Sequence, residues 1–164
     1  MEELKVMEFR IIFLPPFMAV SSGVDVNCDF SSKGILGKFN KYFSNIQQKP
    51  MYNQIPNDLL FYDPIGKGMV WWYVLTDEII DKEYEIVDFE GGYYLVYSYI
   101  YGDEDMKKLM LAEARKYIKE SKIFELDERD NHYIMGHIIT PDEIVEMQGW
   151  AQVEVFIPIK ITKK

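Results

Sequence analysis

A glutamate between aromatic residues near the end of the chain is the feature best suited to chemistry. Glu154 follows Trp150 and precedes Phe156. If 151–161 is a strand, alternate side chains share a face, which puts Glu154 and Phe156 on the same side. A carboxylate beside aromatic rings can bind a cationic aromatic ligand through charge, stacking and cation–π attraction. A solvated glutamate on an exposed sheet face fits the same pattern, so both interpretations stay open.

The strand predicted over 69–75 carries two tryptophans and a tyrosine in succession. Neighbouring side chains of a strand point to opposite faces, so Trp71 and Tyr73 share one face. They are expected to face a groove, a helix or solvent. The residues expected in the core are those on the opposite face, namely Val70, Trp72 and Val74.

The strand predicted over 93–101 is aromatic on both faces, with Tyr93 and Tyr97 on one side and Tyr94 on the other. Aromatic side chains dominate cores, but two aromatic faces exceed what one core requires. One face is therefore expected to meet a ligand or the opposite half of the chain.

Several other kinds of site are excluded by residue type and spacing. His132 and His137 are five apart in a predicted strand, hence on opposite faces, and so cannot hold a metal together. Cys28 has no obvious base nearby and is interpreted as a plain free thiol. The segment Gly66-Lys67-Gly68 lacks P-loop spacing and is interpreted as a hairpin turn. No Ser-His-Asp arrangement is suggested, and we expect no cofactor and no metal.

The charge balance narrows the class of partner. The 164 residues include 27 acidic and 18 basic ones, a formal net charge of −9, and the pI is near 4.7. This argues against nucleic acid as a direct partner and against an anionic membrane. Lacking a long apolar segment and a basic leader, the chain is expected to be cytoplasmic.

Hydrophobic periodicity predicts a β-α-β-β order that occurs twice. Gly34 and Gly37 weaken the first predicted helix. The predicted elements are a strand over 9–20 that is broken at Pro15-Pro16, a helix after Ser31-Ser32, strands over 58–65 and 69–75, a strand over 84–101 that is broken at 90–92, a helix over 103–122, a strand over 131–139, a polar connection over 140–149 and a strand over 151–161.

A shift of about 75 residues superimposes the two halves in both strand and helix phase. We therefore predict an α+β fold made of duplicated β-α-β-β units with antiparallel sheets and two main helices. The chain would form one domain of two pseudo-repeats, over about 5–80 and 84–162.

Three segments resemble the gyrase-inhibitor-like effector-binding domains, the ligand-binding halves of AraC- and MerR-type multidrug regulators. They are Phe17-Met18-Ala19-Val20, Tyr93-Tyr94-Leu95-Val96 and the closing 153–159 with its hydrophobic-Pro-Ile ending. Stand-alone members of this family exist, and because the first predicted strand begins near residue 9, we expect this chain to be one of them, without a preceding helix-turn-helix. The resemblance implies a central groove between the halves for bulky, often cationic, aromatic molecules, with aromatics and a buried glutamate in it.

The family pattern is altered in one place. Its strand before the last usually carries an aromatic-Glu-x-Tyr pattern, whereas here the matching stretch is His132-Tyr133-Ile134-Met135-Gly136-His137. Glu154, one strand later, replaces the usual glutamate if it faces the groove, and Phe156 takes the last-strand aromatic position. The expected ligand-binding residues are Trp71, Tyr73, Tyr93, Tyr97, Trp150, Glu154 and Phe156.

The leading hypothesis is a stand-alone protein that captures bulky hydrophobic ligands, cationic aromatic ones among them, in a groove between the two halves. It would be linked to transcriptional regulation or to a multidrug or toxin response. One alternative is a small hydrolase of strained electrophiles, which would use Glu154 with Tyr133 or Tyr93, as the resemblance implies for some relatives. A second is a protein-binding inhibitor in the manner of the gyrase inhibitors, with a regulatory protein or gyrase as its partner.

Overall fold

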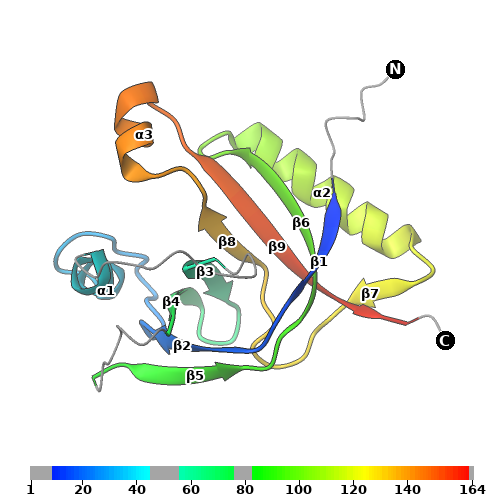
Figure 1. Cartoon of the computed structure of the whole chain (residues 1–164), viewed down its shortest axis with the longest axis horizontal. Helices are drawn as coiled ribbons and strands as arrows, with labels where there is room; N and C mark the ends of the chain where they lie inside the picture. Colours follow the sequence, from blue (N-terminus) through cyan, green and yellow to red (C-terminus); the bar gives the residue numbers. More distant parts are fainter. Residues whose placement is uncertain (1–8, 45–55, 76–82, 163–164) are drawn as a thin grey trace. The chain divides into compact units, whose positions relative to one another are not determined.

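The computed structural model describes residues 9–44, 56–75 and 83–162 and has a mixed α+β fold with antiparallel strand pairing (Figure 1). It divides the chain into two compact units. Unit 1 comprises residues 1–14 and 92–164, and unit 2 comprises residues 15–91.

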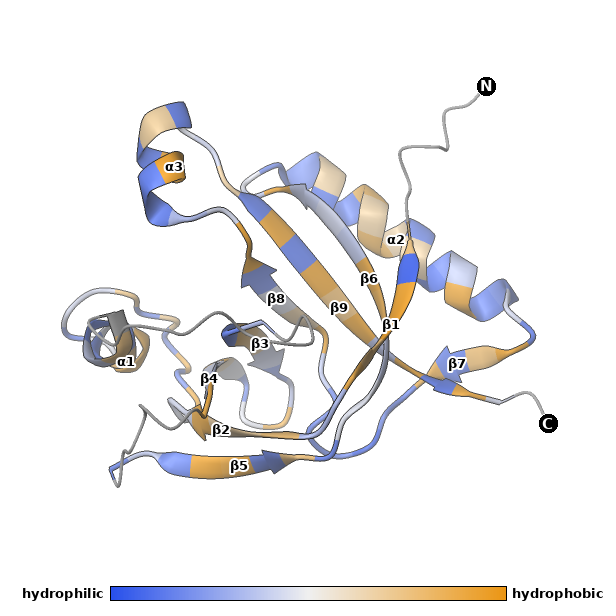
Figure 2. Ribbon diagram, viewed as in Figure 1, coloured by the Kyte–Doolittle hydropathy of each residue, from blue (hydrophilic) through white to orange (hydrophobic). Residues whose placement is uncertain are grey.

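Unit 1 is an antiparallel sheet with one long helix. Its strand order is β1–β6–β9–β8, and β7 also pairs with β9. Figure 2 shows hydrophobic and hydrophilic residues alternating at the start of β9. The elements are β1 (Arg10–Leu14), β6 (Gly92–Ile100), α2 (Glu104–Glu120), β7 (Phe124–Leu126), β8 (Met135–Ile138), α3 (Asp142–Gln148) and β9 (Gln152–Ile161).

Helix α2 covers one face of this sheet, which we call the α2 face. Asp103 caps the start of the helix, and its side chain accepts a hydrogen bond from the backbone N–H of Met106 at 3.0 Å. Asp103 therefore satisfies one of the free N–H groups of the first turn. The buried core on this face contains Leu95 and Tyr97 of β6, Val155, Ile157 and Ile159 of β9, Phe124 of β7, and Met110, Ala114 and Ile118 of α2.

The described residues of unit 2 form four strands and one helix. The strand order is β5–β2–β4–β3. Helix α1 packs its Phe39 and Phe43 against Val20 of β2, with Trp71 and Tyr73 of β4 beside them. Its elements are β2 (Phe17–Ser21), α1 (Ile35–Ser44), β3 (Asp58–Asp63), β4 (Gly68–Val74) and β5 (Glu85–Phe89).

The alternation predicted for β4 is confirmed. Val70, Trp72 and Val74 are 5%, 2% and 3% exposed. The turn at Gly66-Lys67-Gly68 joins β3 to β4, where Lys67 has a φ of 58° and its N–H donates to the carbonyl of Asp63 at 2.7 Å. This hairpin turn is therefore also confirmed.

The two predicted strand breaks are confirmed, and each one separates the units. Pro15 and Pro16 lie between β1 and β2, because proline lacks the N–H that a central ladder requires. Glu90 and Gly91 lie between β5 and β6, and Gly91 has a φ of 83°, a left-handed conformation that glycine adopts readily.

The structure differs from the sequence-based expectation in three places. The strand predicted over 131–139 is limited to Met135–Ile138, so the interpretation of His132 as a strand residue was wrong. The connection predicted over 140–149 contains α3, a helix in which none of the seven residues is buried. Strand β7 was not predicted. Among the described helices, none is long and apolar enough to cross a membrane.

Candidate functional site

Glu154 lies in the middle of three paired strands of unit 1. On β9 it is directly opposite Ser98 of β6 on one side and His137 of β8 on the other. Side chains directly opposite each other in antiparallel strands share a face and lie about 5 Å apart at Cβ. We call this side of the sheet, opposite the α2 face, the Glu154 face.

An ion pair holds the Glu154 carboxylate. The Arg10 guanidinium donates from Nη2 to Oε2 of Glu154. The side chain of Glu154 is 16% exposed, whereas that of Arg10 is 56% exposed. The carboxylate is thus mostly withdrawn from solvent, and its partner is largely in solvent.

The Glu154 face is apolar and buried on one side of Glu154 and open on the other. Tyr94, Val96, Phe156 and Met135 are at most 1% exposed. In the other direction, the next residue pair is Ile100 with Gln152. Ile100 is 49% exposed. Glu154 therefore marks the boundary between a buried apolar surface and an accessible one.

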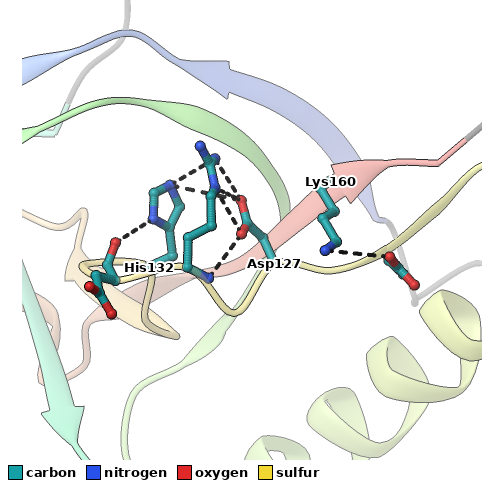
Figure 3. Close-up of polar contacts among 6 residues, drawn as sticks. Asp127, His132 and Lys160 are labelled. Carbon is teal, nitrogen blue, oxygen red and sulfur yellow. Dashed lines mark hydrogen bonds and ion pairs between the residues drawn. The ribbon is translucent and has the colours of Figure 1, made fainter.

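A polar cluster in the loop between β7 and β8 adjoins this face (Figure 3). Arg129 donates to both carboxylate oxygens of Asp127, at 3.0 Å from Nε to Oδ1 and 2.7 Å from Nη2 to Oδ2. The side chains of Asp127 and His132 are fully buried. The His132 ring stacks on Tyr94, with 6.3 Å between ring centroids and 8° between the planes.

The hydrogen bonds of His132 define its tautomer. Nδ1 lies 2.8 Å from the backbone carbonyl of Asp130, and Nε2 lies 3.1 Å from Nη2 of Arg129. A carbonyl only accepts and a guanidinium only donates, so the neutral ring carries its proton on Nδ1 and accepts at Nε2.

Two groups of this cluster have shifted pKa values. Burial raises the pKa of Asp127, but the hydrogen bonds and the positive charge of Arg129 outweigh burial and bring it below its ordinary value of 3.8. Burial, followed by the negative charge of Asp127, raises the pKa of Tyr94 well above its ordinary value. Asp127 is therefore ionised and Tyr94 protonated at neutral pH.

The predicted site residues of unit 1 lie in different places. Glu154 and Phe156 share one face as expected, but Phe156 belongs to the buried part of that face and is 1% exposed. Tyr93 and Tyr97 lie on the α2 face, where Tyr97 is 3% exposed beside α2. Trp150, just before β9, is 45% exposed. The structure therefore does not bring Tyr93 or Tyr97 to Glu154.

Tyr133 lies in the loop before β8, outside the strand in which it was expected. The shortened strand thus removes the alternation that related Tyr133 to its neighbours. Its side chain is half-buried.

Trp71 and Tyr73 face helix α1, one of the three possibilities expected for them. Tyr73 stacks on Phe43, with 4.8 Å between ring centroids and 14° between the planes. Nε1 of Trp71 donates to Oδ2 of Asp58 at 2.9 Å. Both aromatics therefore have a packing role within unit 2.

Arg10 and His137 are the residues that sequence analysis did not connect with Glu154. The only signal for His137 was its even spacing from Met135 within a predicted strand. Arg10 carried no local signal, because its contact with Glu154 depends on strand register.

The described residues contain no cluster of three or more His, Cys, Asp or Glu side chains able to hold a metal ion. Cys28 is exposed and has a free thiol. The Glu154 face therefore offers charge, hydrogen bonding and apolar surface.

Neither protein-family models nor curated protein sequences match this chain. Solved structures do match over nearly the whole chain. They include SAV2435 bound to tetraphenylphosphonium (12% identity, 93% of this chain and 94% of that chain, TM-score 0.53) and a hydrolase from Listeria innocua (10%, 94% and 92%, 0.56). A protein from Staphylococcus aureus described as a proposed transcription regulator also matches (14% identity, 94% and 99%, TM-score 0.55). At these identities the likeness is one of fold, and it is compatible with an effector-binding fold.

Proposed function

We propose that this protein binds bulky hydrophobic small molecules, cationic aromatic ones in particular, at the accessible end of the Glu154 face. The observation that carries this proposal is the carboxylate of Glu154, 16% exposed, at the boundary between buried apolar residues and the exposed Ile100. A carboxylate in that position attracts a cation, and the adjacent apolar surface favours a hydrophobic one.

The arrangement favours such a ligand over a small inorganic cation. The described residues supply no set of acidic or imidazole groups for a metal ion. Glu154 is a single carboxylate opposite Ser98 and His137, with buried apolar side chains at the next residue pairs of the face. Hydrophobic burial would contribute most of the affinity, and the charge would select among ligands of similar shape. Trp150, which precedes β9 and is exposed, is a candidate for stacking.

The structural neighbours support a role of this kind. One of them is bound to tetraphenylphosphonium, a cationic aromatic molecule. In unit 1, β6 precedes α2 and lies between β1 and β9. In unit 2, β2 precedes α1 and lies between β5 and β4. In each unit, the strand before the helix therefore pairs with the last strand of the order β-α-β-β. This common order supports an internal duplication and membership of the effector-binding family. A groove between the halves and a link to regulation or toxin response stay predictions.

Binding can be measured by isothermal titration with tetraphenylphosphonium and with triphenylphosphine oxide, a neutral analogue. Glu154→Gln removes the charge at nearly constant shape. We expect it to weaken tetraphenylphosphonium binding about tenfold or more, as for loss of a charged interaction of ~1.5–3 kcal/mol, and to leave the neutral analogue unaffected. The control Glu125→Gln changes an exposed carboxylate paired with Lys160 at 3.5 Å and should alter neither. Equal binding by Glu154→Gln and the wild type would contradict the proposal.

A second candidate function is hydrolysis of strained electrophiles, and the position of His137 opposite Glu154 favours it. Glu154 would act as general base and take a proton from water, whose oxygen then attacks the ring carbon. In an epoxide the ring C–O bond breaks as the water oxygen bonds to the carbon, and the ring oxygen takes up the proton that Glu154 removed from water, which gives a diol and regenerates the carboxylate. Diol formation from styrene oxide, abolished by Glu154→Gln, would support this activity. Binding without turnover would contradict the hydrolase function and leave ligand binding as the one supported function.

A further inference from the structure

We propose that Arg10 is an internal counter-ion of Glu154 that a cationic ligand displaces when it binds. This inference rests on the proposed function and adds how the site is regulated. Without ligand, the Arg10 guanidinium occupies the carboxylate that the ligand cation would use. Binding is then an exchange of one cation for another.

Arg10 reaches Glu154 from a strand that does not pair with β9. Arg10 is on β1 and Glu154 on β9, with β6 between them. Two strand spacings amount to about 10 Å. Arg10 is opposite Val96, which in turn is opposite Phe156, and Glu154 lies two residues before Phe156 on β9. The Arg10 side chain therefore reaches diagonally across β6.

The difference in exposure indicates which partner moves. Glu154 belongs to a central strand and is mostly covered, whereas Arg10 belongs to an outer strand and its side chain is more than half exposed. Holding the long, largely exposed Arg10 side chain in one position costs conformational entropy, which offsets part of what the ion pair contributes. Arg10 can thus leave for solvent without disturbing the sheet, while Glu154 stays in place.

The identity of the internal cation indicates the chemistry of its competitor. A guanidinium is planar, delocalised and less strongly hydrated than an ammonium group. A ligand that replaces it has to compensate for the lost N–H···O bond by burying apolar surface over the exposed end of the face, at Ile100. Lipophilic delocalised cations meet this requirement, and small hydrated amines do not.

The test compares tetraphenylphosphonium affinity of the wild type, Arg10→Gln and Arg10→Met by isothermal titration. Methionine retains part of the apolar stem without the charge. Both variants should bind tetraphenylphosphonium about three- to tenfold more tightly than the wild type, and triphenylphosphine oxide as before. Arg115→Gln makes the same change of charge on α2, where Arg115 is exposed, and should leave both affinities unchanged.

The outcomes separate this inference from the proposed function. Tighter binding by both Arg10 variants supports the exchange, including the case where the wild type shows no measurable binding. Wild-type binding that the Arg10 variants leave unchanged or weaken would overturn the exchange while the binding function stands. No binding of tetraphenylphosphonium by the wild type or by either Arg10 variant would overturn both the exchange and the binding function.

Discussion

The rings of His132 and Tyr94 are parallel, although His132 comes from a loop and Tyr94 from the central strand β6. Both residues are buried, and the Arg129 guanidinium donates to the far side of the imidazole. Arg129 is itself held by Asp127. The loop between β7 and β8 is therefore attached to the Glu154 face through one continuous set of side-chain contacts.

Replacing Asp127 with asparagine should destabilise the protein by about 2 kcal/mol, because the buried hydrogen bonds from Arg129 lose their charged acceptor. Urea unfolding followed by far-UV circular dichroism measures the change. Asp130→Asn is the matched control, since only the backbone carbonyl of Asp130 bonds to His132. Equal stability of Asp127→Asn and the wild type would show that the cluster contributes little.

Stability should fall in acid, in part through Asp127. Its pKa in the folded protein lies below the ordinary 3.8, so the unfolded chain takes up a proton first as the pH decreases. Its contribution is thus complete well above pH 3.8 and is lost as the pH falls through the lower folded value. The stability difference between wild type and Asp127→Asn, measured by urea unfolding from pH 7 to pH 3, should shrink below about pH 4. A constant difference would contradict this.

Gly37→Ala should destabilise the protein, although alanine is the better helix former by about 1 kcal/mol. A Cβ at position 37 would lie 1.7 Å from the backbone oxygen of Ser31, too close for any real contact. Relieving it requires movement of the loop before α1, so we expect a net loss of about 1–3 kcal/mol. Thermal unfolding tests this, with Lys38→Ala as an exposed control in the same helix. An increase in melting temperature for Gly37→Ala would mean that the loop gives way freely.

Patterns within one element could be predicted from the sequence. The alternation of β4 placed Trp72 in the core, and the prolines at 15–16 marked the break between β1 and β2. Both signals are local, because alternation and the missing proline N–H act on the strand that contains them.

Relationships between elements could not be predicted in the same way. The contact of Arg10 with Glu154 depends on the registers of two strand pairs, which are fixed by packing over the whole sheet. His132 was misplaced because Asp127 and Arg129 hold the chain ahead of β8 with side-chain hydrogen bonds, and these compete with extension of the strand. Helix α3 has seven residues, DEIVEMQ, and is too short to repeat the apolar stripe by which helices are predicted.

The division of the chain has a consequence for its synthesis. Unit 2 is one uninterrupted stretch, residues 15–91, whereas unit 1 is assembled from segments on either side of it. On the ribosome, the strands of unit 2 can all pair before β6, the partner of β1, has emerged. Strand β1 has no β6 to pair with until the whole of unit 2 has been synthesised. Arg10 can contact Glu154 only after another 144 positions have been translated. The ion pair at the candidate site is thus among the last contacts that a nascent chain can make.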